Sequence, residues 1–294
     1  MKLITKRDPD TGFDHVLGVT IPQRKKDSHK YDYGCDLIIG GSVSYTGAPV
    51  YSAEAASRAG AGLVFLGVPE KIYEIETVKA DSAIPFPLEC EASGMLSAAA
   101  FFEVSRRFPK SDVCLIGPGM GRSESTAALT HKIVEHYDKQ LILDADGINA
   151  LIGHIDVLGL SERPMILTPH MGEFSRIGGD TSASPPDAAR DYAVKHNCIM
   201  VLKGHETVTA FPDGDVYINT TGGPGLSKGG SGDILAGIIL SFVGQGFPLK
   251  SAVPAAVFIH GLAGDICEKE LGEYSVLPSD VIRAIPKAIL QLMG

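Results

Sequence analysis

The stretch GGPGLSKGGSGDILAGIILSF, residues 222–242, joins a glycine-rich loop to a strongly apolar segment. Apolar side chains recur at helical spacing from Ile234 to Val243, which predicts a helix over 233–245. Asp233 then lies in the first turn of this helix or at its N-cap. Glycines let successive backbone N–H groups converge, and the helix N-terminus adds partial positive charge. The loop therefore predicts a binding site for phosphate.

Two interpretations of Asp233 remain open on these residues alone. Asp233 could simply cap its helix, since aspartate is a favoured N-cap residue. It could instead be a base that takes the proton of a hydroxyl group attacking a phosphoryl group. The second interpretation is favoured because the loop holds more glycine than capping needs. Its spacing also differs from the GxxxxGK[ST] pattern of a P-loop.

The composition is that of an ordinary globular protein with an acidic balance. The chain has 294 residues, of which 44% are hydrophobic and 21% charged, and its formal net charge is -9. This charge argues against nucleic acid or an anionic membrane as a partner, so an anionic ligand must be held locally by backbone N–H groups and a few lysines. Five scattered cysteines without a CxxC pair are typical of reduced thiols. With no leader-like or membrane-length apolar run, we expect a cytoplasmic protein.

Short apolar runs alternate with segments of helical periodicity along the chain. This alternation predicts an α/β fold with a central, mostly parallel sheet and helices on both faces, in a single domain over residues 1–294. The predicted strands are 36–41, 62–68, 112–119, 140–147, 165–170 and 198–204, followed by a hairpin of TVTAFP and DVYIN across Asp213-Gly214. The predicted helices lie near 50–60, 95–107, 123–136, 186–197, 233–245, 251–270 and 279–292. The segment SPPDAAR (184–190) is expected to be a loop leading into a helix, and not a domain boundary.

Small and titratable residues follow the predicted parallel strands, in the segments GGS, GPGMG, DADG, TPHMGE and LKGHE. Ligands of open α/β sheets bind at the carboxyl ends of the strands, so these segments are candidates for the site. Each also has a structural alternative. Lys203 could be a solvated lysine and His170 a structural histidine. TPHMGE could be a helix entry with Glu173 in the first turn, and the remaining positions could serve turns: Asp144, Asp146, Gly117 and Gly119.

The glycine-rich loop also resembles the signature of the ADP/ATP-dependent NAD(P)H-hydrate dehydratases, which belong to the ribokinase-like superfamily. Segments similar to other parts of that family follow in the same order: SHKYDYG (28–34), GGSVSYTGAP (40–49), AASRAGAGLV (55–64), GPGMG (117–121), LDADGIN (143–149), TPHMGE (168–173) and LKGHETV (202–208). The resemblance runs from about residue 20 to the C-terminus. It implies a ribokinase-like fold and a lyase that uses ADP or ATP, with Mg²⁺, to restore NADH and NADPH from their hydrates, NADHX and NADPHX.

The resemblance also implies roles for individual residues. Asp233 would be the base and would contact the hydrate, and the catalytic anion hole would be Gly230, Ser231 and Gly232. The expected contacts of the nucleotide are Lys203, Gly204, His205, Glu206, Thr207, Gly229 and Gly232. The hydrate pocket would include Ala48, Gly119 and His170, and Mg²⁺ would be organised through water by Glu173 and Asp144. Relatives further suggest a homo-oligomer, for example a tetramer.

Three loop positions depart from the family pattern. Relatives commonly carry asparagine at Gly223, a small hydroxyl residue at Lys228 and threonine at Ser231. Lys228 could strengthen nucleotide binding, change the preference between ADP and ATP, or point into solvent. The loop looks like the prokaryotic branch of the family, which generally favours ADP. Two other functions stay open: a small-molecule kinase of the same superfamily acting on a vitamin-precursor alcohol, and a catalytically silent nucleotide sensor, against which the presence of Asp233 counts.

Overall fold

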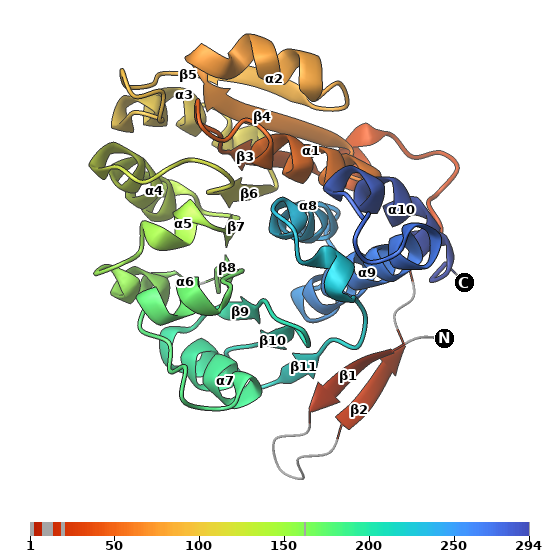
Figure 1. Cartoon of the computed structure of the whole chain (residues 1–294). Coiled ribbons are helices and arrows are strands. Elements are labelled where there is room, and N and C mark those ends of the chain that lie inside the picture. Colours follow the sequence, from red (N-terminus) through yellow and green to blue (C-terminus); the bar gives the residue numbers. More distant parts are fainter. Residues whose placement is uncertain (1–2, 8–13, 19–20, 162, 294) are drawn as a thin grey trace.

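A central sheet organises the chain in the computed structural model, which describes residues 3–7, 14–18, 21–161 and 163–293 (Figure 1). Within the described residues the sheet has 11 strands, in the order β2-β1-β11-β10-β9-β8-β7-β6-β3-β4-β5. The strands are β1 (Leu3–Arg7), β2 (Asp14–Gly18), β3 (Cys35–Ile39), β4 (Leu63–Pro69), β5 (Ile84–Leu88), β6 (Val113–Ile116), β7 (Gln140–Leu143), β8 (Ile166–Leu167), β9 (Ile199–Leu202), β10 (Val208–Ala210) and β11 (Val216–Ile218). Strands β9 through β5 in this order are parallel, and β10, β11, β1 and β2 extend the sheet with antiparallel pairs.

Helices cover both faces of this sheet (Figure 1). They are α1 (Ala48–Ala59), α2 (Tyr73–Lys79), α3 (Phe101–Ser105), α4 (Glu124–His136), α5 (Asp146–Asn149), α6 (Met171–Arg176), α7 (Pro185–His196), α8 (Ser231–Gly244), α9 (Leu249–Leu271) and α10 (Pro278–Leu290). Helices α1, α8, α9 and α10 share one apolar core with the sheet, and α3, α4, α6 and α7 share the other. The α/β architecture with two covered faces is as predicted.

The parallel strands are apolar throughout because both of their faces are buried. In β6, Val113 and Leu115 join the core beneath α8, whereas Cys114 and Ile116 join the core on the opposite face. Since successive side chains of a strand point to opposite faces, a strand covered on both sides needs no alternation of polar and apolar residues. This explains why runs such as QLIL are uninterrupted in the sequence.

Every predicted parallel strand forms, but several end earlier than expected. The predicted strand 140–147 stops at Leu143, because DADG turns away from the sheet and begins α5. Strands β1, β2 and β5 were not predicted. β5 (IPFPL) contains two prolines, which an edge strand tolerates because it pairs on one side only. The predicted hairpin across Asp213-Gly214 is confirmed as β10–β11.

Two helix predictions need correction. The predicted helix 95–107 is broken, since residues 98–100 form a 3₁₀ turn ahead of the short α3. The segment 184–190 is not a loop, because α7 already begins at Pro185. Ser184 caps this helix by accepting a hydrogen bond from the Asp187 N–H, and proline fits the first helical position, where no intrahelical bond is lost. The short helices α2, α5 and α6 were also not among the predicted elements.

The packing of α1 against α8 brings two distant parts of the chain to one edge of the sheet. Gly237 of α8 permits this contact, because a Cβ there would lie 2.2 Å from the carbonyl oxygen of Ser52. The Ser52 hydroxyl donates a hydrogen bond to the carbonyl oxygen of Asp233 over 2.9 Å. The N-termini of both helices therefore lie beside the carboxyl ends of the parallel strands. Among the described residues, no helix has the length and apolar character needed to cross a membrane.

Candidate active site

The glycine-rich loop opens α8, as the sequence predicted. Gly230 is the N-cap residue, with a φ of 100°, and a Cβ there would lie 2.8 Å from the ring of Tyr51. Helix α8 begins at Ser231, so Asp233 lies in the first turn and is not the N-cap. The first N–H groups of a helix have no partner within it. In α8 these N–H groups belong to the segment in which Ser231, Gly232 and Asp233 line a cavity of about 870 Å³. The start of α8 is therefore a favourable place for an anion.

Asp233 has the electrostatic surroundings of a base that works near neutral pH. Burial raises the pKa of Asp233 to about 7, the carboxylate of Asp144 adds to the rise, and the ammonium group of Lys203 opposes it. A carboxyl group with this pKa can accept a proton at neutral pH and is a stronger base than an ordinary aspartate. The capping position alone would not need such a shift, because an N-cap carboxylate works best fully ionised.

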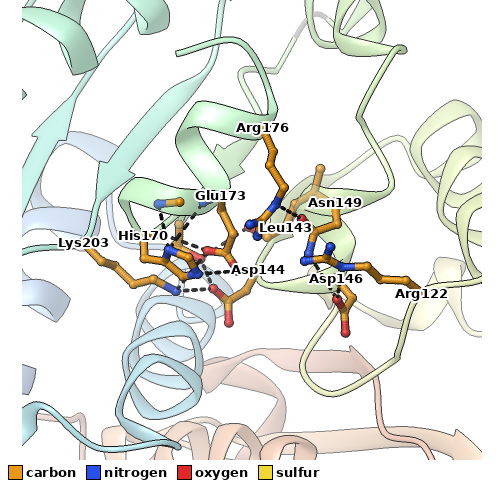
Figure 2. A network of polar contacts seen from close by, with 11 residues as sticks. Arg122, Leu143, Asp144, Asp146, Asn149, His170, Glu173, Arg176 and Lys203 are labelled. Atoms are coloured by element: carbon orange, nitrogen blue, oxygen red, sulfur yellow. Dashed lines mark hydrogen bonds and ion pairs between the residues drawn. The ribbon is translucent and has the colours of Figure 1, made fainter. Parts of the chain in front are cut away.

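Lys203 lies between a carboxylate pair and the start of α8. Its Nζ is 2.8 Å from Asp144 Oδ1 and 4.0 Å from Glu173 Oε2 (Figure 2). A Cβ placed on Gly232 would lie 3.1 Å from the same Nζ, so the ammonium group reaches the first turn of α8. Burial by itself would lower the pKa of Lys203, but Asp144 and Glu173 outweigh this and raise it. Lys203 is therefore a fixed cation beside the predicted anion hole, and it is not a solvated lysine.

His170 and Glu173 form the entry of α6. His170 is the N-cap, its Nδ1 accepts hydrogen bonds from the N–H groups of Gly172 and Glu173, and Glu173 Oε2 accepts one from the His170 N–H. This reciprocal arrangement is a capping box. The alternative interpretation of TPHMGE as a helix entry is thus confirmed. With Nδ1 used as an acceptor, the neutral ring carries its proton on Nε2, and the half-exposed imidazole can donate it to a ligand.

Ala48 and Gly119 meet at the neighbouring part of this edge. A Cβ on Gly119 would lie 3.1 Å from the Cβ of Ala48, which is the first residue of α1. Neither residue lines the cavity beside α8. Because Ser52, one turn further along α1, is hydrogen-bonded to Asp233, the contact between Ala48 and Gly119 lies near Asp233 from the other side. His170, the third predicted hydrate contact, lines the cavity itself.

The predicted nucleotide contacts lie along the cavity with one exception. Lys203, Gly204, His205 and Thr207 line it on one side, and Gly229, Gly230, Ser231 and Gly232 line it on the other. Glu206 is exposed and does not line it. Lys228 also lines the cavity, but its Nζ donates a hydrogen bond to the Tyr274 carbonyl oxygen over 2.7 Å. This bond fastens the loop to the segment between α9 and α10, a role that the sequence did not suggest for Lys228.

Helix α9 supplies three polar residues that the sequence analysis missed. His260 Nε2 and Ser231 Oγ lie 3.2 Å apart and share a hydrogen bond, and burial lowers the pKa of His260 to about 4, which keeps its ring neutral. Asp265 accepts a hydrogen bond from the Gly222 N–H and Glu268 accepts one from the Gly225 N–H. The signal for them was present: in an apolar helix, Asp265 and Glu268 share a face with Gly261 and Gly264.

The acidic residues fit magnesium only through water. Asp144 Oδ1 already accepts hydrogen bonds from Thr168 and Lys203, and Glu173 is engaged at the start of α6. Among the described residues, no group of three or more His, Cys, Asp or Glu is arranged to hold a metal ion. Mg²⁺ usually keeps several waters and binds substrate phosphates with one or two carboxylates. Asp144 and Glu173 are therefore suited to bind the waters around a Mg²⁺ ion rather than the ion itself.

A further cavity of similar volume, about 890 Å³, lies at the opposite end of α8. It is lined largely by residues 21–33 together with Arg58, Phe242 and Gln245. None of the predicted site residues lies there. The chemistry is therefore assigned to the cavity at the carboxyl ends of the strands, where the titratable groups and the helix N-terminus converge.

Comparisons with known proteins identify the family of the chain. A family model described as NAD(P)H-hydrate dehydratase matches residues 36–287. The bifunctional NAD(P)H-hydrate repair enzyme Nnr of Thermofilum pendens is 37% identical over 278 residues, covering 93% of this chain and 53% of that protein. The ADP-dependent (S)-NAD(P)H-hydrate dehydratase of Neisseria meningitidis is 34% identical over 266 residues, covering 88% of this chain and 84% of that protein. The chain spans about half the length of the bifunctional relatives it matches.

Solved structures show the same fold. A ribokinase-like superfamily protein of Enterococcus faecalis has a TM-score of 0.81 at 28% identity, covering 93% of each chain. The ADP/ATP-dependent NAD(P)H-hydrate dehydratase of Bacillus subtilis, co-crystallised with ATP and Mg²⁺, has a TM-score of 0.77 at 29% identity, covering 93% of this chain and 95% of that one. The fold is ribokinase-like, as predicted. With the family model matching residues 36–287, the chain belongs to the NAD(P)H-hydrate dehydratase family.

Proposed function

We propose that this protein is an ADP- or ATP-dependent dehydratase of the S form of NADHX and NADPHX. Its reaction would restore NADH or NADPH and release phosphate with AMP or ADP. The observation that carries the proposal is Asp233, a carboxyl group of pKa about 7 in the first turn of α8, beside a glycine-rich anion site and the ammonium group of Lys203. Membership of the dehydratase family and the names of the relatives support the choice of substrate.

The first step is transfer of a phosphoryl group to the hydroxyl group of the hydrated ring. Asp233 accepts the hydroxyl proton as the hydroxyl oxygen bonds to the terminal phosphorus of the nucleotide, and the bond from that phosphorus to the leaving nucleotide breaks. The charge on the transferring group is stabilised by the N–H groups at the start of α8, which Gly230, Ser231 and Gly232 present, and by Lys203. Mg²⁺, held by the phosphates and waters next to Asp144 and Glu173, would neutralise phosphate charge.

The second step is elimination of phosphate. Hydroxide is a poor leaving group, whereas a phosphate ester departs readily. The ring nitrogen lone pair expels the phosphate with the C–O bond electrons, and the adjacent ring carbon then loses a proton to restore the reduced nicotinamide. His170 lines the cavity and its Nε2 lies 3.6 Å from Glu173 Oε1, so in this proposal the half-exposed imidazole contacts the ring substituents beside Glu173.

In this proposal the nucleotide binds in the cavity beside α8. Lys203, Gly204, His205 and Thr207 would border it on one side and the glycine loop on the other. The hydrate would approach from the border formed by Ala48, Gly119 and His170, so that its hydroxyl group meets the phosphoryl group beside Asp233. Both reactants then converge from opposite sides on one carboxylate, which is the arrangement that direct transfer requires.

The test is incubation of the purified protein with NADHX or NADPHX, Mg²⁺ and either ADP or ATP. Recovery of the absorbance of reduced nicotinamide together with release of free phosphate is the expected result. A small-molecule kinase would instead leave a stable phosphorylated alcohol, and a silent sensor would bind nucleotide without turnover. Either outcome would overturn the proposal. The comparison of the two nucleotides also decides the phosphoryl donor, for which ADP is our expectation.

We also retain the predictions of a cytoplasmic location, a homo-oligomeric state such as a tetramer, and a single domain over residues 1–294. Support for the first comes from composition, since the five cysteines (Cys35, Cys90, Cys114, Cys198 and Cys267) are all free thiols. Size-exclusion chromatography with light scattering measures the oligomeric state directly, and a monomer would contradict that prediction.

A further inference from the structure

Two arginines at the carboxyl edge of the sheet are held in place by a shared polar network, which the proposed chemistry does not use. Arg122 Nε donates a hydrogen bond to Asp146 Oδ1 over 3.3 Å, and Arg176 Nε donates one to Asn149 Oδ1 over 2.9 Å. The Asn149 amide donates to the same Asp146 oxygen over 3.1 Å, which joins the two halves. We call Arg122, Asp146, Asn149 and Arg176 the two-arginine cluster. In Figure 2 the two arginine side chains reach Asp146 and Asn149 from different directions.

The cluster leaves the anion-binding ends of both arginines available. Each guanidinium group is fixed through its Nε, and within the described residues no partner is found for the terminal NH₂ groups of Arg122 or Arg176. Both side chains are exposed, whereas Asp146 is 19% exposed and Asn149 is buried. A pair of terminal NH₂ groups matches phosphate oxygens in a fork geometry, and a fixed fork loses less conformational freedom when it binds.

The location of the cluster indicates which ligand it binds. The Gly121 N–H donates to Asp146 Oδ2 over 2.9 Å, so the cluster contacts the loop that carries Gly119. Arg176 lies in α6, whose N-cap is His170. The cluster is therefore placed between two of the predicted contacts of the hydrated ring. None of its members lines the cavity assigned to the phosphoryl donor.

The charge balance of the site also requires further cations. Lys203 is paired with Asp144 and serves the transferring phosphoryl group, and Lys228 is tied to the Tyr274 carbonyl oxygen. When the nicotinamide ring of a dinucleotide is bound at the site, its diphosphate extends away from the reacting hydroxyl group. A chain of net charge -9 offers no general attraction for this diphosphate. Arg122 and Arg176, neutralised only in part by Asp146, supply a local positive charge on that path.

From these observations we propose that the two-arginine cluster binds the diphosphate of the dinucleotide substrate and positions its nicotinamide ring. The inference rests on the proposed function for the identity of the ring, but binding of the diphosphate by the arginines can be measured without turnover. It also predicts that NADH and NADPH use the cluster equally, because the diphosphate is common to both, and the additional 2′-phosphate of NADPH lies elsewhere.

The test compares the wild type with the double variant Arg122→Gln/Arg176→Gln. Binding of NADH and of NADPH is measured by nicotinamide fluorescence, and binding of reduced nicotinamide riboside, which has no phosphate, is measured in the same way. We expect both dinucleotides to bind about tenfold more weakly to the variant, the size expected for two charge-assisted hydrogen bonds at an exposed site. The riboside should bind equally to both proteins, and the difference should shrink as the salt concentration rises.

The matched control is Arg106→Gln/Arg190→Gln, which removes the same charge. Arg106 directly follows α3 and Arg190 lies in α7, and both are ion-paired to neighbouring carboxylates. This control should bind the dinucleotides as the wild type does. The variant Arg176→Lys, which keeps the charge but loses the Nε donor to Asn149, should fall between the wild type and Arg176→Gln.

Three outcomes would overturn the proposal: unchanged dinucleotide binding by the double variant, an equal loss for the riboside, or a loss confined to NADPH. The last would assign the cluster to the 2′-phosphate instead. The proposed function fails separately, if the wild type shows no turnover of NADHX. In a turnover assay the KM for the hydrate should rise in the double variant, whereas the KM for ADP should stay the same.

Discussion

Asp233 is the side chain on which the proposed chemistry depends, and its surroundings are suited to that task. It lies in a helix first turn, where a carboxylate is stabilised by the helix dipole, yet burial and the neighbouring Asp144 raise its pKa to about 7. Lys203 opposes the rise and is itself ion-paired with Asp144. At the residue scale the site is therefore a balance between one cation and several buried carboxylates. Two predictions follow from this balance.

Replacing Asp233 with asparagine removes the base and keeps the shape of the side chain. We expect kcat to fall by roughly three or more orders of magnitude, because proton transfer by a positioned base contributes about that much or more to such reactions. The affinity for ADP, measured by calorimetry, should stay within about threefold of the wild type, since Asp233 acts mainly in the transition state. Near-normal turnover by the variant would exclude the assigned role.

The pH profile of the wild type should report the same group. Asp233 must be ionised to accept a proton, and its pKa is raised to about 7. Activity should therefore be lost as the pH falls below about 7 and be level above it. The measurement is kcat/KM against pH with saturating nucleotide. An acidic limb near the pKa of an ordinary aspartate, about 4, would contradict the burial argument.

His260 should act through Ser231, with which it shares a hydrogen bond. His260→Phe removes that bond, and we expect kcat to fall by about tenfold as the Ser231 hydroxyl loses its orientation. In a Ser231→Ala background the same substitution should have little further effect, which a double-mutant cycle would measure. Equal losses in both backgrounds would mean that His260 serves only the packing of α9. The acidic limb of the pH profile should not move, because His260 is neutral.

At the scale of elements, the glycine-rich loop is fastened to α9 by two carboxylates. Asp265 and Glu268 accept hydrogen bonds from the N–H groups of Gly222 and Gly225, over 3.0 Å and 2.6 Å. Lys228 adds a third attachment, to the segment after α9. A loop rich in glycine has high conformational entropy when free, so these attachments hold its N–H groups ready for an anion. Helix α9 thus positions the loop that α8 continues.

Glu268→Ala tests this fastening. The substitution leaves the Gly225 N–H without its acceptor, which costs about 1–3 kcal/mol for a buried group, so we expect the KM for the nucleotide to rise about tenfold. Glu270→Ala is the matched control, since Glu270 is in the same helix but is exposed and paired with Lys287. Steady-state kinetics with varied ADP gives both values. Equal effects in the two variants would show that the loop does not depend on Glu268.

At the scale of the whole molecule, the sheet is buried on both faces by two apolar cores, and β3 carries an ionisable side chain into this interior. Asp36 of β3 is fully buried, and within the described part of the chain neither of its oxygens has a hydrogen-bond partner. Burial raises the pKa of Asp36 well above its usual range, and Asp112 adds to the rise. The protein therefore holds a proton on Asp36 that the unfolded chain would release, which makes its stability depend on pH.

Asp36→Asn should make the protein less sensitive to alkaline pH. Since the folded state binds this proton more tightly than the unfolded state, stability falls as the pH rises from the unfolded pKa of about 4 towards the raised folded value. The variant lacks this loss, so its melting temperature should exceed that of the wild type at pH 8, and the difference should shrink at pH 4. Calorimetry at several pH values measures it. A difference independent of pH would contradict the assignment.

Much of the architecture follows from local sequence patterns. Uninterrupted apolar runs predicted the parallel strands, because a strand buried on both faces leaves no room for polar residues, and the periodicity after Asp233 predicted α8. The edge strand β5 escaped prediction, since its two prolines disfavour a strand unless one side is left unpaired. Which strand lies at the edge is a property of the complete sheet.

The sequence by itself determined which segments are candidates for the chemistry, since the glycine-rich loop, Asp233, Lys203 and the motifs at the strand ends stand out through local pattern and family resemblance. Only the tertiary structure decided which side chains meet. The ion pair of Lys203 with Asp144 joins the residues that directly follow β9 and β7, and the contacts of Asp265 and Glu268 join α9 to the loop. The two-arginine cluster joins α5 and α6 to the loop after β6. Such contacts depend on the packing of distant elements, and so do burial and the shifted pKa of Asp233, because local sequence patterns do not encode the distance between residues far apart in the chain.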